Sequence, residues 1–240
     1  MRLSASLPLS IVIPVLFAAS NASAGVIWNE STDGDLSDAA ATPTVLGTLG
    51  LGSNTMSGTS TAGTEEDLTI PNQPEYPDMN PDFWSLTIAP GQRLQNIALT
   101  NYSWTNPNVH SGASGPGGGV PGGGAFFGVQ SGSQITGGIT GPPSQLLGGG
   151  LIGILSGAQA GDDVLDDLGS GTFAAAGVPT FSGPLGAGTY TFWYQEGPTD
   201  TQYSLDFQVT AVPEPTTLTG VGMLALAMLR FRRKKLRADP

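Results

Sequence analysis

Clustered aspartates are the residues of this 240-residue chain whose type and spacing are best suited to binding a metal ion. Carboxylate oxygens are the hard ligands that Ca²⁺ prefers. The aspartates fall in two clusters, one around residues 33–38 and one around residues 162–167. Neither cluster has the spacing of an EF-hand loop or of a Gly-Gly-x-Gly-x-Asp repeat. The alternative is that these are solvated acids that keep the domain soluble. We therefore predict no organic cofactor and name calcium as the candidate ion. Its candidate ligands are Asp33, Asp35, Asp38, Asp162 and Asp163, with Asp166 and Asp167 close to the second group.

Catalytic chemistry has few other side chains to draw on. The chain has no cysteine and one histidine, His110, in the loop-like sequence Asn-Pro-Asn-Val-His-Ser-Gly. No Gly-x-Ser-x-Gly elbow accompanies it, and a zinc site would have only carboxylates as its further ligands of the usual kind. A glycosidase pair of carboxylates stays open, because sequence spacing in a sheet does not give distance. The sequence predicts no catalytic residue and a non-enzymatic protein, with a secreted hydrolase as the weaker alternative.

Basic residues are almost confined to the two ends of the chain. Of the 19 acidic residues, all but Glu214 and Asp239 lie between residues 25 and 212, where Arg93 is the one basic side chain. Nucleic acids and anionic lipids are bound through lysine and arginine side chains that neutralise phosphates. The charge distribution therefore excludes both as partners of the central region.

The first 24 residues have the composition of a secretory signal peptide. Arg2 precedes an apolar stretch over 7–19, and the small residues Ala22-Ser23-Ala24 form a cleavage site before Gly25. The stretch has 13 residues, whereas a membrane span needs about 20. We therefore expect cleavage between Ala24 and Gly25, and export of the mature chain.

The C-terminal residues 212–240 have a three-part order. Val212, Pro213, Glu214 and Pro215 precede an apolar run over 218–229, which a basic cluster follows: Arg230, Arg232, Arg233, Lys234, Lys235 and Arg237. The run predicts a membrane helix whose cations stay on the cytoplasmic side. A helix over 216–229 spans about 21 Å of a core of about 30 Å, so the first arginines must snorkel.

This order resembles the PEP-CTERM sorting signal of exported bacterial proteins, with Pro213, Glu214 and Pro215 as the motif. The resemblance implies that an exosortase-type membrane enzyme acts at or near the motif after export. It also implies that the transiently anchored protein then reaches the cell surface or the extracellular matrix. A permanent C-terminal anchor is the alternative.

Residues 25–211 have no sustained helical period and alternate strand-like runs with turns, which predicts one all-β domain built as an antiparallel sandwich or barrel-like sheet. We predict that strands 83–88 and 93–104 form one hairpin and that strands 189–195 and 202–210 form another. Shorter strands are expected at 26–29, 44–49, 54–59, 125–130 and 151–155. The sole predicted helix covers 162–168, and the glycine-rich stretches 112–124 and 132–150 are predicted to be loops without a fixed backbone.

Three segments of this region resemble the bacterial pre-peptidase C-terminal domain. They are Asp33-Gly-Asp-Leu-Ser, the stretch from Asp82 to Ile88 with Pro90-Gly91, and the stretch from Leu185 to Trp193 followed by Tyr203-Ser-Leu-Asp-Phe. The resemblance implies a jelly-roll-like β-sandwich, here a surface or matrix component that binds other matrix material. A carbohydrate-binding module for exopolysaccharide is the alternative, because aromatic rings can stack on sugars. Most aromatic residues on strands are core, and Trp193 is the candidate for an exposed ring among Trp84, Tyr102, Trp104, Tyr190, Trp193 and Tyr194.

Overall fold

A computed structural model of the protein describes residues 25–60, 81–104, 125–153, 159–169, 176–181, 183–195 and 201–213. The predicted signal peptide, His110, the glycine-rich stretch 112–124 and the sorting segment from Glu214 lie outside these residues. The elements, in chain order, are β1 (Gly25–Asn29), α1 (Glu30–Asp33), β2 (Thr44–Thr48), β3 (Gly52–Ser60), β4 (Asp82–Ile88), β5 (Gln92–Trp104), β6 (Ala125–Ser131), η1 (Pro143–Gln145), β7 (Gly148–Ile152), β8 (Gly188–Gln195) and β9 (Thr201–Ala211).

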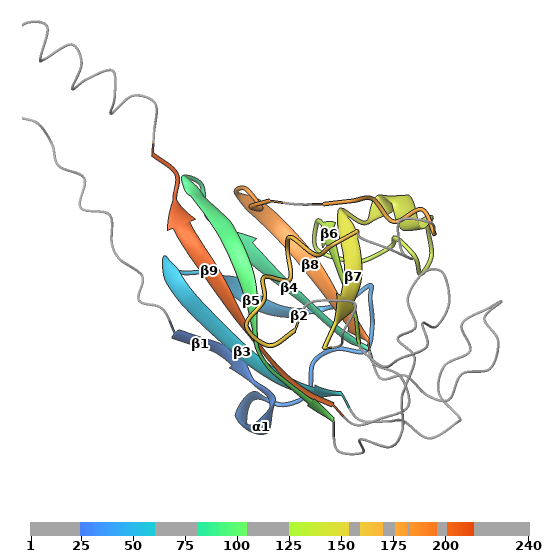
Figure 1. The fold of residues 1–240 in the computed structure, drawn as a ribbon, viewed down its shortest axis with the longest axis horizontal. Coiled ribbons are helices and arrows are strands. Elements are labelled where there is room, and N and C mark those ends of the chain that lie inside the picture. The colour runs from blue at the N-terminus through green and yellow to red at the C-terminus, as the bar shows by residue number, and fades with distance from the viewer. Residues whose placement is uncertain are drawn as a thin grey trace, which may run out of the picture.

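The strands form two sheets, which makes the described fold all-β. A four-stranded sheet has the order β1-β3-β9-β5, and a five-stranded sheet has the order β2-β4-β8-β6-β7. Figure 1 shows β3 and β9 of the first sheet to the left of β8, β6 and β7 of the second. The strands predicted from alternation are all present, with shifted ends; the run expected at 151–155 begins earlier, as β7.

The two predicted hairpins are wrong, because each pair of strands divides between the sheets. β4 pairs with β8 in the five-stranded sheet, whereas β5 pairs with β9 in the four-stranded sheet. The turn that the first hairpin requires is present between β4 and β5. Gly91 has φ +76°, and the Gln92 N–H donates to the Ala89 carbonyl oxygen at 3.1 Å. A Pro-Gly turn reverses the chain, but it does not determine which sheet the next strand joins.

Both sheets are mixed, which corrects the prediction of a purely antiparallel sandwich. β1 runs parallel to β3, and β2 runs parallel to β4, while the five other pairings are antiparallel. From β1 to β5 the chain changes sheet at every step. Two successive crossings return a strand to its first sheet in its original direction, so these neighbours are parallel.

The main core lies between the facing sheets. Trp84 and Leu86 of β4, with Phe192 and Tyr194 of β8, meet Leu205, Phe207 and Val209 of β9 there, and all are buried. Trp84 stacks on Phe192 with ring centroids 5.8 Å apart and an interplanar angle of 10°. Alternate residues of β4, β8 and β9 therefore face this core.

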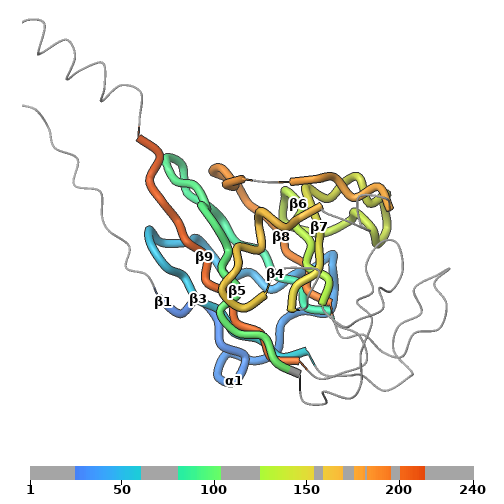
Figure 2. Tube along the Cα trace, viewed as in Figure 1, coloured from blue at the N-terminus to red at the C-terminus, as the bar shows by residue number. Residues whose placement is uncertain are grey.

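A second core covers the outer face of the five-stranded sheet, formed by Phe83, Phe126, Ile135, Leu146, Leu151, Val178 and Trp193. Ile135 and Leu146 belong to the glycine-rich stretch 132–150, which was predicted to lack a fixed backbone. Instead the stretch folds back beside β6 (Figure 2). It contains η1, and its last three residues begin β7. The prediction is wrong because glycines let this backbone lie close to the sheet: a Cβ at Gly149 would come within 2.9 Å of Phe126.

Residues 162–168 form turns that close the free edge of β5, which corrects the helix predicted there. The Val164 N–H donates to the Ile97 carbonyl oxygen at 2.8 Å, and the Gly161 N–H donates to that of Leu99 at 2.7 Å. The segment therefore uses its backbone groups against a strand rather than within a helix. Among the residues that the structure describes, no helix is long and apolar enough to cross a membrane.

Candidate functional site

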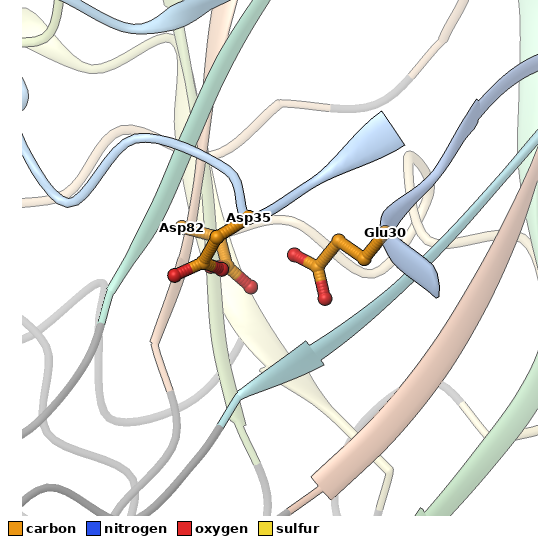
Figure 3. A group of neighbouring side chains, drawn as sticks. All are labelled: Glu30, Asp35 and Asp82. Carbon is orange, nitrogen blue, oxygen red and sulfur yellow. The ribbon is translucent and has the colours of Figure 1, made fainter. Parts of the chain in front are cut away.

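Three carboxylates from separate segments converge at one end of the sandwich: Glu30, Asp35 and Asp82, called here the carboxylate cluster. One oxygen from each residue lies within 4.8 Å of the others. Glu30 opens α1, Asp35 lies in the loop that follows α1, and Asp82 opens β4. In Figure 3 the carboxylate of Glu30 extends toward those of Asp35 and Asp82.

Glu30 is held in place by backbone and side-chain donors. Its Oε2 accepts from the backbone N–H of Thr59 and, at 2.8 Å, from the Thr59 hydroxyl, while Oε1 accepts from the Leu36 N–H at 3.4 Å. The short helix α1 is itself capped, since Asn29 Oδ1 accepts from the Ser31 N–H and Asp33 Oδ2 accepts from the Asn29 N–H. These bonds fix the direction of the Glu30 side chain toward the cluster.

The loop that carries Asp35 is fixed on both sides of that residue. Gly34 has φ +94°, a conformation that favours glycine, and its N–H donates to the Glu30 carbonyl oxygen at 3.1 Å. Leu36 is buried in the main core, and the Ser37 carbonyl oxygen accepts from the Phe83 N–H at 2.8 Å. The loop therefore places Asp35 beside the first residue of β4.

Asp82 is fully buried and is connected to the opposite sheet. Its Oδ2 accepts a hydrogen bond of 2.8 Å from the Tyr203 hydroxyl of β9. Tyr203 is itself buried and stacks on Tyr194, with ring centroids 4.1 Å apart. One carboxylate therefore connects a strand of each sheet.

The second oxygen of Asp82 differs from the first. Oδ1 is buried and has no hydrogen-bond partner among the described residues. Leaving a buried carboxylate oxygen without a partner is costly, because the group has lost its hydration shell. A donor or a cation at this oxygen would therefore stabilise the buried carboxylate.

The pKa values of the cluster also indicate that a positive charge would be favourable there. Burial, followed by the charge of Glu30, raises the pKa of Asp82 well above its ordinary value, although the Tyr203 hydrogen bond opposes the shift; Asp35 and Asp38 add smaller increases. Burial also raises the pKa of Glu30, against the hydrogen bonds from Thr59. Negative charge is therefore unfavourable here unless a positive charge compensates it.

The other predicted ligands lie elsewhere or have local roles. Asp162 Oδ2 accepts from the Gln159 N–H at 2.9 Å, and Asp163 Oδ1 accepts from the N–H groups of Ile97 and Leu165 at 2.9 and 3.0 Å. Asp33 caps α1 as described above. Asp35 is thus the predicted ligand that the structure brings into the cluster, while Asp38 acts on Asp82 through its charge.

Sequence reasoning missed Glu30 and Asp82. The position of Asp82 was an available signal. It stands directly before the alternating residues of β4, at a strand end where a buried position would normally hold an apolar residue. Glu30 offered none, because its distance from Asp82 along the chain hides the contact. Of the processing-site residues, Gly25 begins β1, and Val212 and Pro213 follow β9.

The aromatic residues considered for sugar stacking are mostly buried where they are described. Trp193 was expected to be exposed, but it is 4 % exposed and packs edge-on against Phe126 at 4.7 Å under the glycine-rich stretch. Trp84 and Tyr194 lie in the main core, and Tyr102 and Tyr190 are partly buried. The expected exposure of Trp193 is therefore wrong, because the outer face of its sheet has its own cover.

No family model matches the chain, and neither a curated protein nor a solved structure matches it.

Proposed function

We propose that the protein is an exported, non-enzymatic component of the cell surface or extracellular matrix. An exosortase-type enzyme would sort it through Val212, Pro213, Glu214 and Pro215. The observation that carries this proposal is the position of these residues relative to the fold. β9 ends at Ala211, and the Val212 N–H donates to the Gly91 carbonyl oxygen at 2.7 Å. The Pro-Glu-Pro sequence thus begins directly after the described domain.

The short distance along the chain supports processing beside the membrane. From Ala211 to the start of the apolar run at Leu218 there are seven residues, which span at most about 25 Å. If that run enters the bilayer, the sandwich stays close to the surface, and Glu214 lies between the domain and the lipid. An enzyme embedded in the same membrane can reach it there.

We further infer that the domain is a β-sandwich related to the pre-peptidase C-terminal domain. Of the three segments that carry the resemblance, the second and third lie in strands that pair with one another, and the first runs from the end of α1 into the loop that follows it. Asp82 to Ile88 forms β4, which pairs with β8, and the strand after Pro90-Gly91 pairs with β9. This pairing supports the resemblance, because the similar segments build one contiguous part of the sandwich.

The test is Glu214→Ala in the native host, with Asp239→Ala as the matched control that removes one acid outside the Pro-Glu-Pro sequence. Wild type and Asp239→Ala should appear shortened and outside the cell or on its surface. Glu214→Ala should stay in the inner membrane at nearly its full length after signal-peptide removal. Equal size and equal membrane retention of Glu214→Ala and wild type would show a permanent anchor and would overturn the proposal.

A further inference from the structure

We propose that the carboxylate cluster is a binding site for a divalent cation, for which calcium has the best-matched chemistry. Two independent observations carry this. Glu30, Asp35 and Asp82 place one oxygen each within 4.8 Å of the others, and Oδ1 of the fully buried Asp82 has no hydrogen-bond partner among the described residues. Figure 3 shows the three carboxylates converging from different segments.

The spacing of the oxygens suits one ion. Calcium binds oxygens at about 2.4 Å, so two ligands of the same ion are at most about 4.8 Å apart. Three carboxylates supply three to six of the six to eight oxygens that calcium takes, and water completes the shell on the side of Asp35, which is exposed. An ion bound within reach of Asp82 Oδ1 would give that oxygen the partner that it lacks among the described residues.

The positions of the ligands determine what the ion would do. Glu30 is bonded to Thr59 of β3, Asp35 is fixed by the loop next to β4, and Asp82 is bonded to Tyr203 of β9. These contacts reach both sheets. A cation would therefore connect the segment after β1 to the first residue of β4, at one end of the sandwich. Its role would be to stabilise the fold rather than to catalyse a reaction.

Thermal melting and radioactive calcium binding of the full chain in mild detergent test the proposal. Melts are compared in CaCl₂, in chelator, and in NaCl at the ionic strength of the CaCl₂ sample. At a calcium concentration ten times Kd, the melting temperature should rise by about 3–6 °C, from mass action and the usual size scaling. Equilibrium dialysis should give one ion per chain, with a Kd of about 10⁻⁴–10⁻³ M, as in extracellular modules.

The variant Asp35→Asn locates the ion. Asp35 is exposed, so this change should leave the near-UV circular dichroism in chelator unaltered while weakening calcium binding at least tenfold. Asp166→Asn is the matched control, because Asp166 is also an exposed aspartate but lies in the other acidic group. It should bind calcium as wild type does.

Two results would overturn the proposal. Coincident wild-type melts in calcium and chelator, with no ion retained in dialysis at 10 mM calcium, would show that the cluster is held neutral by protons. Calcium binding that survives Asp35→Asn but is weakened by Asp166→Asn would place the ion at the 162–167 group. Since the wild-type measurement stands alone, a variant that fails to fold does not remove the test.

Discussion

Gly58 lies opposite Tyr203 in the ladder between β3 and β9, and replacing it with alanine should disturb the carboxylate cluster through packing alone. A Cβ at Gly58 would lie 2.8 Å from Cε1 of Tyr203 and closer still to Cζ and Oη. The ring has little room to move, because it is buried and stacked on Tyr194. Relief of the clash must therefore lengthen the bond from the Tyr203 hydroxyl to Asp82.

Two costs contribute to the expected effect of Gly58→Ala. Overpacking a core costs about 1–3 kcal/mol, and the loss of a hydrogen bond to a charged group costs about 1.5–3 kcal/mol. Together they lower the free energy of unfolding by about 2.5–6 kcal/mol, or the melting temperature by about 5–24 °C for a domain of this size. The matched control is Gly186→Ala, where a Cβ would meet no atom within 4 Å.

Urea unfolding followed by tryptophan fluorescence measures both variants, and a double-mutant cycle identifies the cause. Tyr203→Phe removes the hydroxyl that lies closest to the new Cβ, so Gly58→Ala should cost at least about 0.5 kcal/mol less in that background. A cost for Gly58→Ala within about 1 kcal/mol of the Gly186→Ala cost, or strict additivity in the cycle, would refute the reasoning.

Three further variants test other parts of the fold, two by the same unfolding assay and one by hydrogen exchange. Asn54→Ala removes the buried amide that bonds the backbone of residues 50, 52 and 207, and should cost about 2–3 kcal/mol; a cost under about 0.5 would contradict this. Trp193→Ala should cost about 3–5 kcal/mol as a core truncation, whereas an exposed stacking residue would cost almost nothing. Asp163→Ala should speed hydrogen exchange at the Ile97 amide, and unchanged protection there would show that its 2.9 Å bond is unimportant.

Local alternation was enough to place the strands, because the alternation of apolar and polar residues is visible within a short stretch of sequence. Tyr203, Leu205 and Phe207 are buried, as their spacing predicted. Sheet membership was not predictable in this way, because β4 and β5 have the same alternation whether they form a hairpin or cross between sheets. The cover over Trp193 was missed for a related reason: composition alone suggested that the glycine-rich stretch was a loop without partners.

The candidate site shows the same limit more strongly. Asp35 was identified because acids cluster around it in the sequence, but clustering also drew attention to Asp162 and Asp163, which bond to nearby backbone groups. The property that distinguishes Asp82 is burial next to Glu30, and that property arises only when separate segments meet. No spacing rule along the chain contains this information.

The central place of β9 in its sheet has a consequence for the order in which the protein can fold. β9 lies between β3 and β5 and is synthesised after every other strand of the described residues. Until residues 201–211 emerge, β3 and β5 have no strand between them, and the inner face of that sheet stays incomplete. A chain that crosses a membrane from its N-terminus would thus keep this sheet unfolded, and able to pass through a translocon, until residues 201–211 had crossed. During this period its unpaired apolar strands would be exposed to proteolysis and to aggregation.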